Sequence, residues 1–176
     1  MGFILKAHTP RALKYRLNLM ILFLSFDGVL HATGKRRQKF DRLAMLEQWL
    51  RQHPEVNIVI SSKWRNSMDI AELRQLFNED VRHRVLGVTP GPRDQAHDRY
   101  WRLSEIFDWL QYCGTQQEWL VLDDGVFPER FNRLVKCNPL LGLTDQDLDS
   151  LTRIKRQLLA QQPGQRLNQL QDCALA

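Results

Sequence analysis

Five short apolar runs, separated by segments of helical periodicity, constrain the fold of this chain more than any other feature of its sequence. The runs occupy residues 19–26, 57–60, 84–87, 118–122 and 134–137. Strands that alternate with helices are typical of βα units around a parallel sheet. Because the runs are apolar throughout, both faces of the sheet should be covered. The sequence therefore predicts an α/β fold, a Rossmann-like three-layer sandwich with a mainly parallel five-stranded sheet.

Helical patterns fill the intervals between these runs. Helices are expected over residues 40–52, 69–78, 101–113 and 145–161. The first carries Leu43, Leu46 and Leu50 on one stripe, which indicates a face packed against the sheet. Pro54 and Gly114 are suitable stop signals for the first and third helices. Thr144, with an acid three residues later, is a suitable N-cap for the last helix.

The length of 176 residues predicts one domain. We expect a basic, loosely ordered N-terminal arm over residues 1–18, a folded domain over 19–161 and a flexible, Gln-containing tail over 162–176. Basic residues precede the apolar run 19–24, as they do in a signal peptide. The run is far shorter than the roughly 20 residues that span a bilayer. It also lacks a cleavage pattern, so it is interpreted as a buried strand, with no membrane partner.

Cysteine usage and charge restrict the classes of function. The three cysteines are widely spaced and show neither a disulfide framework nor zinc-ligand spacing, which favours a reducing cytoplasm. The formal net charge of +5 is compatible with a polyanionic partner and equally with an ordinary basic surface.

Polar residues follow three of the predicted strands. Ser25, Asp27 and Gly28 come after the first run, Ser61 and Ser62 after the second, and Asp123 and Asp124 after the fourth. Ligands of open α/β sheets bind beyond the carboxyl ends of the strands, so these side chains are expected to converge. Each string also has a plainer interpretation: a turn at Asp27-Gly28, a hairpin at Asp123-Asp124-Gly125, and a loop start at Ser61-Ser62.

The order of these strings resembles the haloacid dehalogenase (HAD) superfamily. The sequence contains, in this order, an apolar strand, a motif like D-x-D-G-V-L, a serine ending the next strand, a cation, and an apolar strand ending in two aspartates. The chain is especially similar to the small phosphatase-like HAD domains associated with Swiss Army Knife RNA-repair proteins. The strings that carry this similarity are Ser61-Ser62-Lys63-Trp64-Arg65, Arg102-Leu103-Ser104-Glu105-Ile106 and Gly142-Leu143-Thr144.

The resemblance implies a Mg²⁺-dependent phosphohydrolase, in which a carboxylate attacks phosphorus and a second acid two residues later protonates the leaving group. Asp27 then corresponds to the acid/base residue and Ser61 to the phosphate-binding hydroxyl. Arg102 corresponds to the cation, with Arg99 and Lys63 as rivals. Further implied substrate-binding residues are Gly28, Ser62, Lys63 and Arg65. Implied Mg²⁺ ligands are Asp123, Asp124 and the main-chain carbonyl of Asp27.

Ser25 departs from the pattern, because it stands at the position of the nucleophile and of one metal ligand. A serine hydroxyl is un-ionised at neutral pH without an adjacent base, and its phosphate ester would lack the reactivity of an acyl-phosphate. The chain is therefore expected to be inactive or severely impaired. A natural loss of function and an introduced substitution both explain Ser25, and the otherwise intact site favours the second.

No interval between the motifs accommodates a cap domain, so the site is expected to be open and to admit a macromolecular phosphate. The basic segment Lys35-Arg36-Arg37-Gln38-Lys39 would rim the opening. RNA or DNA ends are the preferred substrate. The alternatives are a non-catalytic phosphate- or nucleic-acid-binding module and a protein-interaction partner that uses the N-terminal arm.

Two aromatic types near the motifs need separate interpretation. His31 is expected to be an exposed loop histidine rather than a substrate contact. The tryptophans Trp64, Trp101, Trp109 and Trp119 are interpreted mainly as core residues. Trp64 is the exception, because it follows a candidate catalytic strand and could stack on a nucleobase.

Overall fold

A computed structural model describes residues 19–34, 38–91 and 97–160. In this part of the chain the five expected strands form a single parallel sheet in the order β3-β2-β1-β4-β5. The strands are β1 (Met20–Leu24), β2 (Val56–Ile60), β3 (Val85–Val88), β4 (Glu118–Asp123) and β5 (Leu134–Lys136). The predicted α/β sandwich is confirmed.

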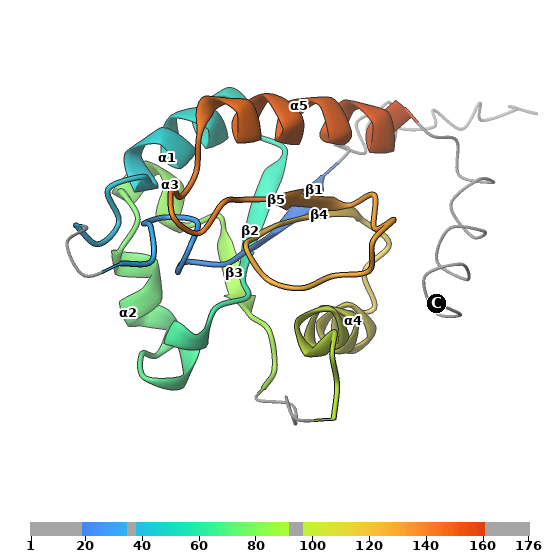
Figure 1. Ribbon diagram of the computed structural model, residues 1–176. Coiled ribbons are helices and arrows are strands. Elements are labelled where there is room, and N and C mark those ends of the chain that lie inside the picture. The colour runs from blue at the N-terminus through green and yellow to red at the C-terminus, as the bar shows by residue number, and fades with distance from the viewer. Residues whose placement is uncertain (1–18, 35–37, 92–96, 161–176) are drawn as a thin grey trace, which may run out of the picture.

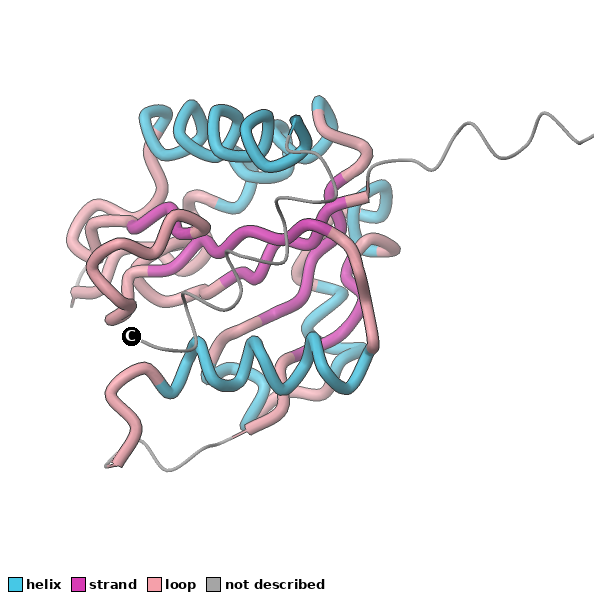
Figure 2. Tube along the Cα trace, turned by 90° about the vertical axis from the view of Figure 1, so that its right-hand side faces the viewer, coloured by secondary structure: helices cyan, strands magenta, loops and turns pink. Residues whose placement is uncertain are grey.

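Helices cover both faces of the sheet, as Figures 1 and 2 show. They are α1 (Leu43–Gln52), α2 (Ile70–Gln75), α3 (Glu79–Arg82), α4 (Trp101–Cys113) and α5 (Asp145–Ala160). In Figure 1, α1 and α5 lie above the sheet and α4 lies below it. A short 3₁₀ helix, η2 (Lys63–Asn66), follows β2. No cap domain interrupts the motifs in the described residues.

Strand alternation divides the core into two layers. Leu22, Leu24 and Ile60 belong to the cluster shared with α1 and α5. Phe23 and Val59 point to the opposite face and pack in the cluster that contains residues of α4. Every residue of β1 is buried, which explains why its sequence is apolar at successive positions.

Two expected helices differ from the structure. The first begins at Leu43 rather than at residue 40, because Phe40 has a positive φ of 62° that a helix excludes. The helix expected over 69–78 is shorter: α2 ends at Gln75, and a separate helix, α3, begins at Glu79. Between them, the backbone N–H of Asn78 donates to the buried carboxylate of Glu47 on α1 at 2.7 Å, and this contact replaces a helical hydrogen bond.

The predicted helix signals at Thr144 and Gly114 are confirmed. Asp147 N–H donates to Thr144 Oγ1 at 3.4 Å, and Thr144 N–H donates to Asp147 Oδ2 at 2.9 Å, which is a capping box. Gly114 ends α4 in the left-handed conformation, with φ of 57°. The predicted arm over 1–18, the tail over 162–176 and Lys35, Arg36 and Arg37 of the basic segment lie outside the described residues.

None of the described helices combines the length and the apolar character needed to cross a membrane.

Candidate functional site

A row of four polar residues crosses the carboxyl edge of the sheet. Leu24 is the last residue of β1, and it pairs with Ile60 of β2 and Leu122 of β4. One step further, the backbone N–H of Ser25 donates to Leu122 at 3.0 Å, and the N–H of Ser61 donates to Leu24 at 2.8 Å. The register therefore places Ser25 between Ser61 on one neighbouring strand and Asp123 on the other. Thr89 extends the row, because its N–H donates to the Ile60 carbonyl at 3.0 Å.

The side chains of Ser25, Ser61 and Asp123 lie on the α4 face of the sheet. Successive residues of a strand point to opposite faces, and Phe23, Val59 and Val121, two positions earlier, pack in the α4-side cluster. In Figure 2 the loops that follow the strands gather at one side of the sheet, and α4 begins at that side. The start of α4 therefore faces the polar row.

Arg102, in the first turn of α4, contacts two members of the row. Its Nη1 donates to the Ser61 carbonyl at 2.5 Å, and its Nε lies 3.1 Å from Asp123 Oδ2. The side chain of Arg102 is 11% exposed and that of Asp123 is fully buried. Of the three candidate cations, Arg102 is thus the one that the structure brings into the row.

Burial controls the charge of Asp123. Removal from water raises the pKa of its carboxyl group to about 7, although the positive charge of Arg102 opposes the shift. The backbone N–H of Gly125 also donates to Asp123 Oδ1 at 2.7 Å, which favours the ionised form. Asp123 is therefore a carboxylate that exchanges its proton near neutral pH.

Asp124 packs against the backbone of Gly28. A Cβ atom at Gly28 would collide with the Asp124 carboxyl group, and Gly28 has a positive φ of 71°. Both the close approach and the backbone conformation therefore require glycine. The turn after β1 and the end of β4 are joined at this contact, which brings Asp27 and Asp124 to the same edge.

Asp27 is held by two side chains. His31 Nε2 lies 3.0 Å from Asp27 Oδ1, and the indole N–H of Trp64 lies 3.2 Å from both carboxylate oxygens. The Asp27 side chain remains 50% exposed. His31 is 8% exposed, so the expectation of an exposed loop histidine is wrong. Its ring packs against Phe40 and Trp64, which is why the sequence position alone misleads.

Two hydroxyl groups of the row lack hydrogen-bond partners among the described residues. Ser61 Oγ and Thr89 Oγ1 are both buried, and neither is satisfied by protein. A buried hydroxyl without a partner is costly unless a ligand or a water molecule satisfies it. Thr89 was not predicted as a site residue. Its position directly after the β3 strand was the one available signal.

The remaining predicted substrate-binding residues divide into two groups. Ser62 caps η2 and accepts from the Trp64 backbone N–H at 3.5 Å, while Lys63 is exposed. Arg65 instead forms a buried ion pair with Glu105 at 2.6 Å and donates to the Ser62 carbonyl at 2.9 Å. Its guanidinium group is therefore engaged by the protein.

Of the three plainer interpretations of the motifs, one is wrong and two are confirmed. The hairpin at Asp123-Asp124-Gly125 is wrong, because β4 and β5 are parallel. Asp27-Gly28 does form a turn, and Ser61-Ser62 does begin a loop. These features coexist with the convergence of the motifs and do not replace it.

The donors at this edge are hard oxygen atoms, the type that Mg²⁺ prefers. Asp123 Oδ2 is buried and accepts no directed hydrogen bond, and Asp124 is adjacent to it. Within the described residues, however, no three His, Cys, Asp or Glu side chains are grouped as a metal site.

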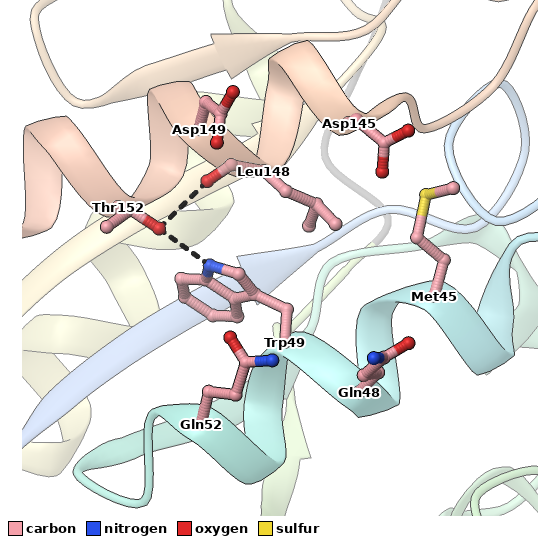
Figure 3. Close-up of a pocket in the computed structure, with 8 residues that line it drawn as sticks. All are labelled: Met45, Gln48, Trp49, Gln52, Asp145, Leu148, Asp149 and Thr152. Carbon is pink, nitrogen blue, oxygen red and sulfur yellow. Dashed lines mark hydrogen bonds between the residues drawn. The ribbon is translucent and has the colours of Figure 1, made fainter.

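A separate cavity of about 250 Å³ lies between α1 and α5 (Figure 3). It is lined by Met45, Gln48, Trp49, Gln52, Asp145, Leu148, Asp149 and Thr152. The indole N–H of Trp49 donates to Thr152 Oγ1 at 2.9 Å across it. None of the predicted site residues lines this cavity.

Comparison with known proteins identifies the family. Residues 21–148 match the family described as "HAD domain in Swiss Army Knife RNA repair proteins", and the match includes every motif of the polar edge. Neither the curated proteins nor the solved structures contain a significant match. Because the match spans well over half of the 176 residues, the chain belongs to the HAD domains of Swiss Army Knife RNA repair proteins.

Proposed function

We propose that this HAD domain binds a phosphate ester at the carboxyl edge of its sheet and is, with Ser25, a severely impaired Mg²⁺-dependent phosphohydrolase. The proposal rests on the row of Ser25, Ser61 and Asp123 across neighbouring strands, and on Arg102, which contacts the Ser61 carbonyl and Asp123. Hydroxyl groups beside a guanidinium at one edge of the sheet are the donors that a phosphoryl group needs.

Each group has a distinct part in this proposal. The free hydroxyl of Ser61 donates to a phosphoryl oxygen, which would satisfy an otherwise orphaned polar atom. Arg102 supplies positive charge and lies within reach of the same oxygens. Asp27, held by His31 and Trp64, donates a proton to the leaving-group oxygen and later accepts one from water.

Mg²⁺ would be held by Asp123, Asp124 and the main-chain carbonyl of Asp27, and when bound it neutralises charge on the transferring phosphoryl group. Ser25 contributes a hydroxyl in place of a carboxylate, so the affinity for Mg²⁺ should be reduced. The proton that Asp123 retains up to about pH 7 competes with the metal for the same oxygen.

Ser25 would also account for the proposed loss of turnover. Its hydroxyl is a weak nucleophile without an adjacent base. Asp27 is engaged by Trp64 and His31, and Asp123 by Arg102. Neither carboxylate is therefore free to activate the serine without losing its other contact.

The proposed substrate is a phosphorylated nucleic-acid end. The family is that of RNA repair proteins, the described residues contain no cap over the site, and the chain carries a net charge of +5. A site without a cap, in a chain that carries a net positive charge, suits an extended polyanion better than a small enclosed metabolite.

A second function, phosphate binding without catalysis, is favoured by Ser25 itself. The polar row and Arg102 retain the hydroxyl and guanidinium groups that would hold a phosphate, but the row lacks the carboxylate that would attack it. Such a pseudophosphatase would bind RNA ends with an affinity that falls steeply as salt is added.

Replacing Ser25→Asp tests the catalytic proposal. With Mg²⁺, the Ser25→Asp protein should hydrolyse an aryl phosphate and a 3′-phosphorylated oligonucleotide, whereas the parent protein should show little or no turnover. The double variant Ser25→Asp/Asp27→Asn is the matched control and should lose most of the regained rate, because removal of a general acid–base residue costs about 10² to 10⁴-fold.

Two outcomes separate the proposals. If Ser25→Asp folds normally and hydrolyses no phosphoester, the catalytic proposal fails. If the same protein still binds phosphorylated ends, the pseudophosphatase function is favoured instead.

A further inference from the structure

Trp101, the first residue of α4, is a tryptophan outside the core. It is half-buried, yet it belongs to neither hydrophobic cluster of the described residues. Among the described residues, the ring contacts found for Trp101 are with cations: Arg102 lies 4.6 Å and Lys63 5.5 Å from its ring centroid. The expectation that Trp101 is a core residue is therefore wrong.

The position of Trp101 ties it to the polar row. Arg102 contacts the Trp101 ring and also binds the Ser61 carbonyl and Asp123. One side chain, that of Arg102, therefore contacts both the indole and the row proposed to hold phosphate. A nucleotide whose terminal phosphate binds at the row would carry its base toward the ring.

Exposed basic side chains lie against this ring and two residues before it in the chain. Lys63 and Arg99 are exposed, and the guanidinium of Arg99 lies 5.6 Å from the Tyr100 ring centroid. Aromatic rings interleaved with exposed cations are the pattern by which proteins bind single-stranded nucleic acid, with bases stacked on rings and phosphates held by cations.

We infer that Trp101 is a stacking platform for an unpaired base next to the phosphorylated end, and that Lys63 and Arg99 hold the adjoining backbone phosphates. This inference rests on the proposed function and restricts its substrate to single-stranded ends. The exposed ammonium of Lys63 leaves the ring for a phosphate when a base stacks there.

Trp64, the residue first expected to stack on a base, is less suited to this function. Its indole N–H is directed at Asp27, and its ring packs against Phe26 and Phe40 and below the Lys39 ammonium. Trp64 is also packed against the main core cluster. Its contacts are those of a positioning residue.

Fluorescence anisotropy tests the inference on the full chain with its native Ser25. The probe is a short single-stranded oligoribonucleotide with a 3′-phosphate and a 5′ label. Trp101→Ala should weaken binding by about 5- to 100-fold, the usual effect of removing one stacking ring. Trp101→Phe should restore most of the affinity. Tyr112→Ala, an aromatic deletion on the same helix at a 91% exposed position, is the matched control and should bind as the parent does.

The charge component is tested in the same assay. Lys63→Gln should weaken binding and reduce its dependence on salt, because one phosphate contact is lost. Arg156→Gln, an exposed basic residue on α5, is the control and should have no comparable effect. A blunt duplex with the same terminal phosphate should bind the parent protein more weakly than the single strand.

The results distinguish this inference from the proposed function. Equal affinities of Trp101→Ala and Tyr112→Ala for the single strand would overturn the inference, even if Ser25→Asp hydrolyses aryl phosphate. If Trp101→Ala weakens binding but removal of the terminal phosphate from the probe does not, the stacking surface is supported and the proposed phosphate site fails.

Discussion

The indole N–H of Trp64 points at both carboxylate oxygens of Asp27, at 3.2 Å from each. Trp64 comes from η2 after β2, and Asp27 from the turn after β1, so the contact links two of the strand ends. A carboxylate that is half exposed would otherwise sample several rotamers. The contact therefore orients the residue proposed to exchange protons with substrate and water.

Removing this donor should slow catalysis while preserving the ring. In the Ser25→Asp background, Trp64→Phe should lower kcat about tenfold with little change in KM, because a misplaced acid loses part of its 10² to 10⁴-fold contribution. Trp49→Phe is the control, since it also deletes an indole hydrogen bond, to Thr152 at 2.9 Å, but away from the site. Equal kcat values for the two variants would show that Trp64 does not position Asp27.

Gly28 should tolerate no side chain. Gly28→Ala is expected to destabilise the fold by about 1 to 3 kcal/mol, because alanine meets both a positive φ and the Asp124 carboxyl group. Gly34→Ala, where a Cβ would meet nothing within 4 Å, is the matched control. Urea unfolding measures both, and similar midpoints would contradict the close contact between Gly28 and Asp124.

The buried carboxyl group of Asp123 should make stability depend on pH. Its pKa is raised to about 7 in the folded state, so the folded protein takes up a proton that the unfolded chain has lost. The stability contributed by this proton is fully present below the unfolded pKa near 4 and is lost as the pH rises through 7. In metal-free buffer Asp123→Asn, which has no such charge to bury, should therefore gain stability relative to the parent as the pH rises.

The unfolding free energy of Asp123→Asn relative to the parent should be higher at pH 8 than at pH 5 by on the order of 2 kcal/mol. Urea unfolding at the two pH values in the presence of a chelator measures it. Asp149→Asn, at an exposed position on α5, is the control. A stability difference between Asp123→Asn and the parent that does not change with pH would contradict the buried, proton-binding state of Asp123.

The Arg65–Glu105 pair should be structural. The side chains are 4% and 0% exposed, and burial lowers the pKa of Arg65 while the Glu105 charge opposes that shift. Arg65→Leu leaves a buried carboxylate without this partner and should cost about 3 kcal/mol of unfolding free energy. Asp80→Asn removes only the surface pair with Arg51 and should have little effect. Denaturant unfolding compares them, and equal losses would contradict a structural role for the buried pair.

The sequence predicted most of the architecture because strand and helix periods are local signals. The buried strands and α4 with its Gly114 cap follow from apolar runs and stop residues. The break between α2 and α3 does not, because it depends on Glu47, which lies thirty-one positions before Asn78. The start of α1 was missed for a related reason, since the conformation of Phe40 follows from its packing against Phe26, His31 and Trp64.

The residues of the candidate site also divide into those signalled by the local sequence and those that depend on packing between distant residues. Ser25, Ser61 and Asp123 could be found from the sequence because each follows or ends an apolar run. The burial of His31 and the position of Trp101 outside the core clusters could not, since they depend on which side chains surround each ring. Thr89 is intermediate. It directly follows an apolar strand, which the sequence predicts, but its place in the row depends on how β3 pairs with β2.

An amide NMR titration with inorganic phosphate in the presence of Mg²⁺ tests most directly whether these residues form one phosphate site. The amides of Ser25, Asp27, Ser61 and Asp124, together with the guanidinium signals of Arg102, should shift with a single shared Kd, because one anion contacts them all. Shifts that follow different binding curves, or that leave these residues unchanged at saturating phosphate, would contradict the account.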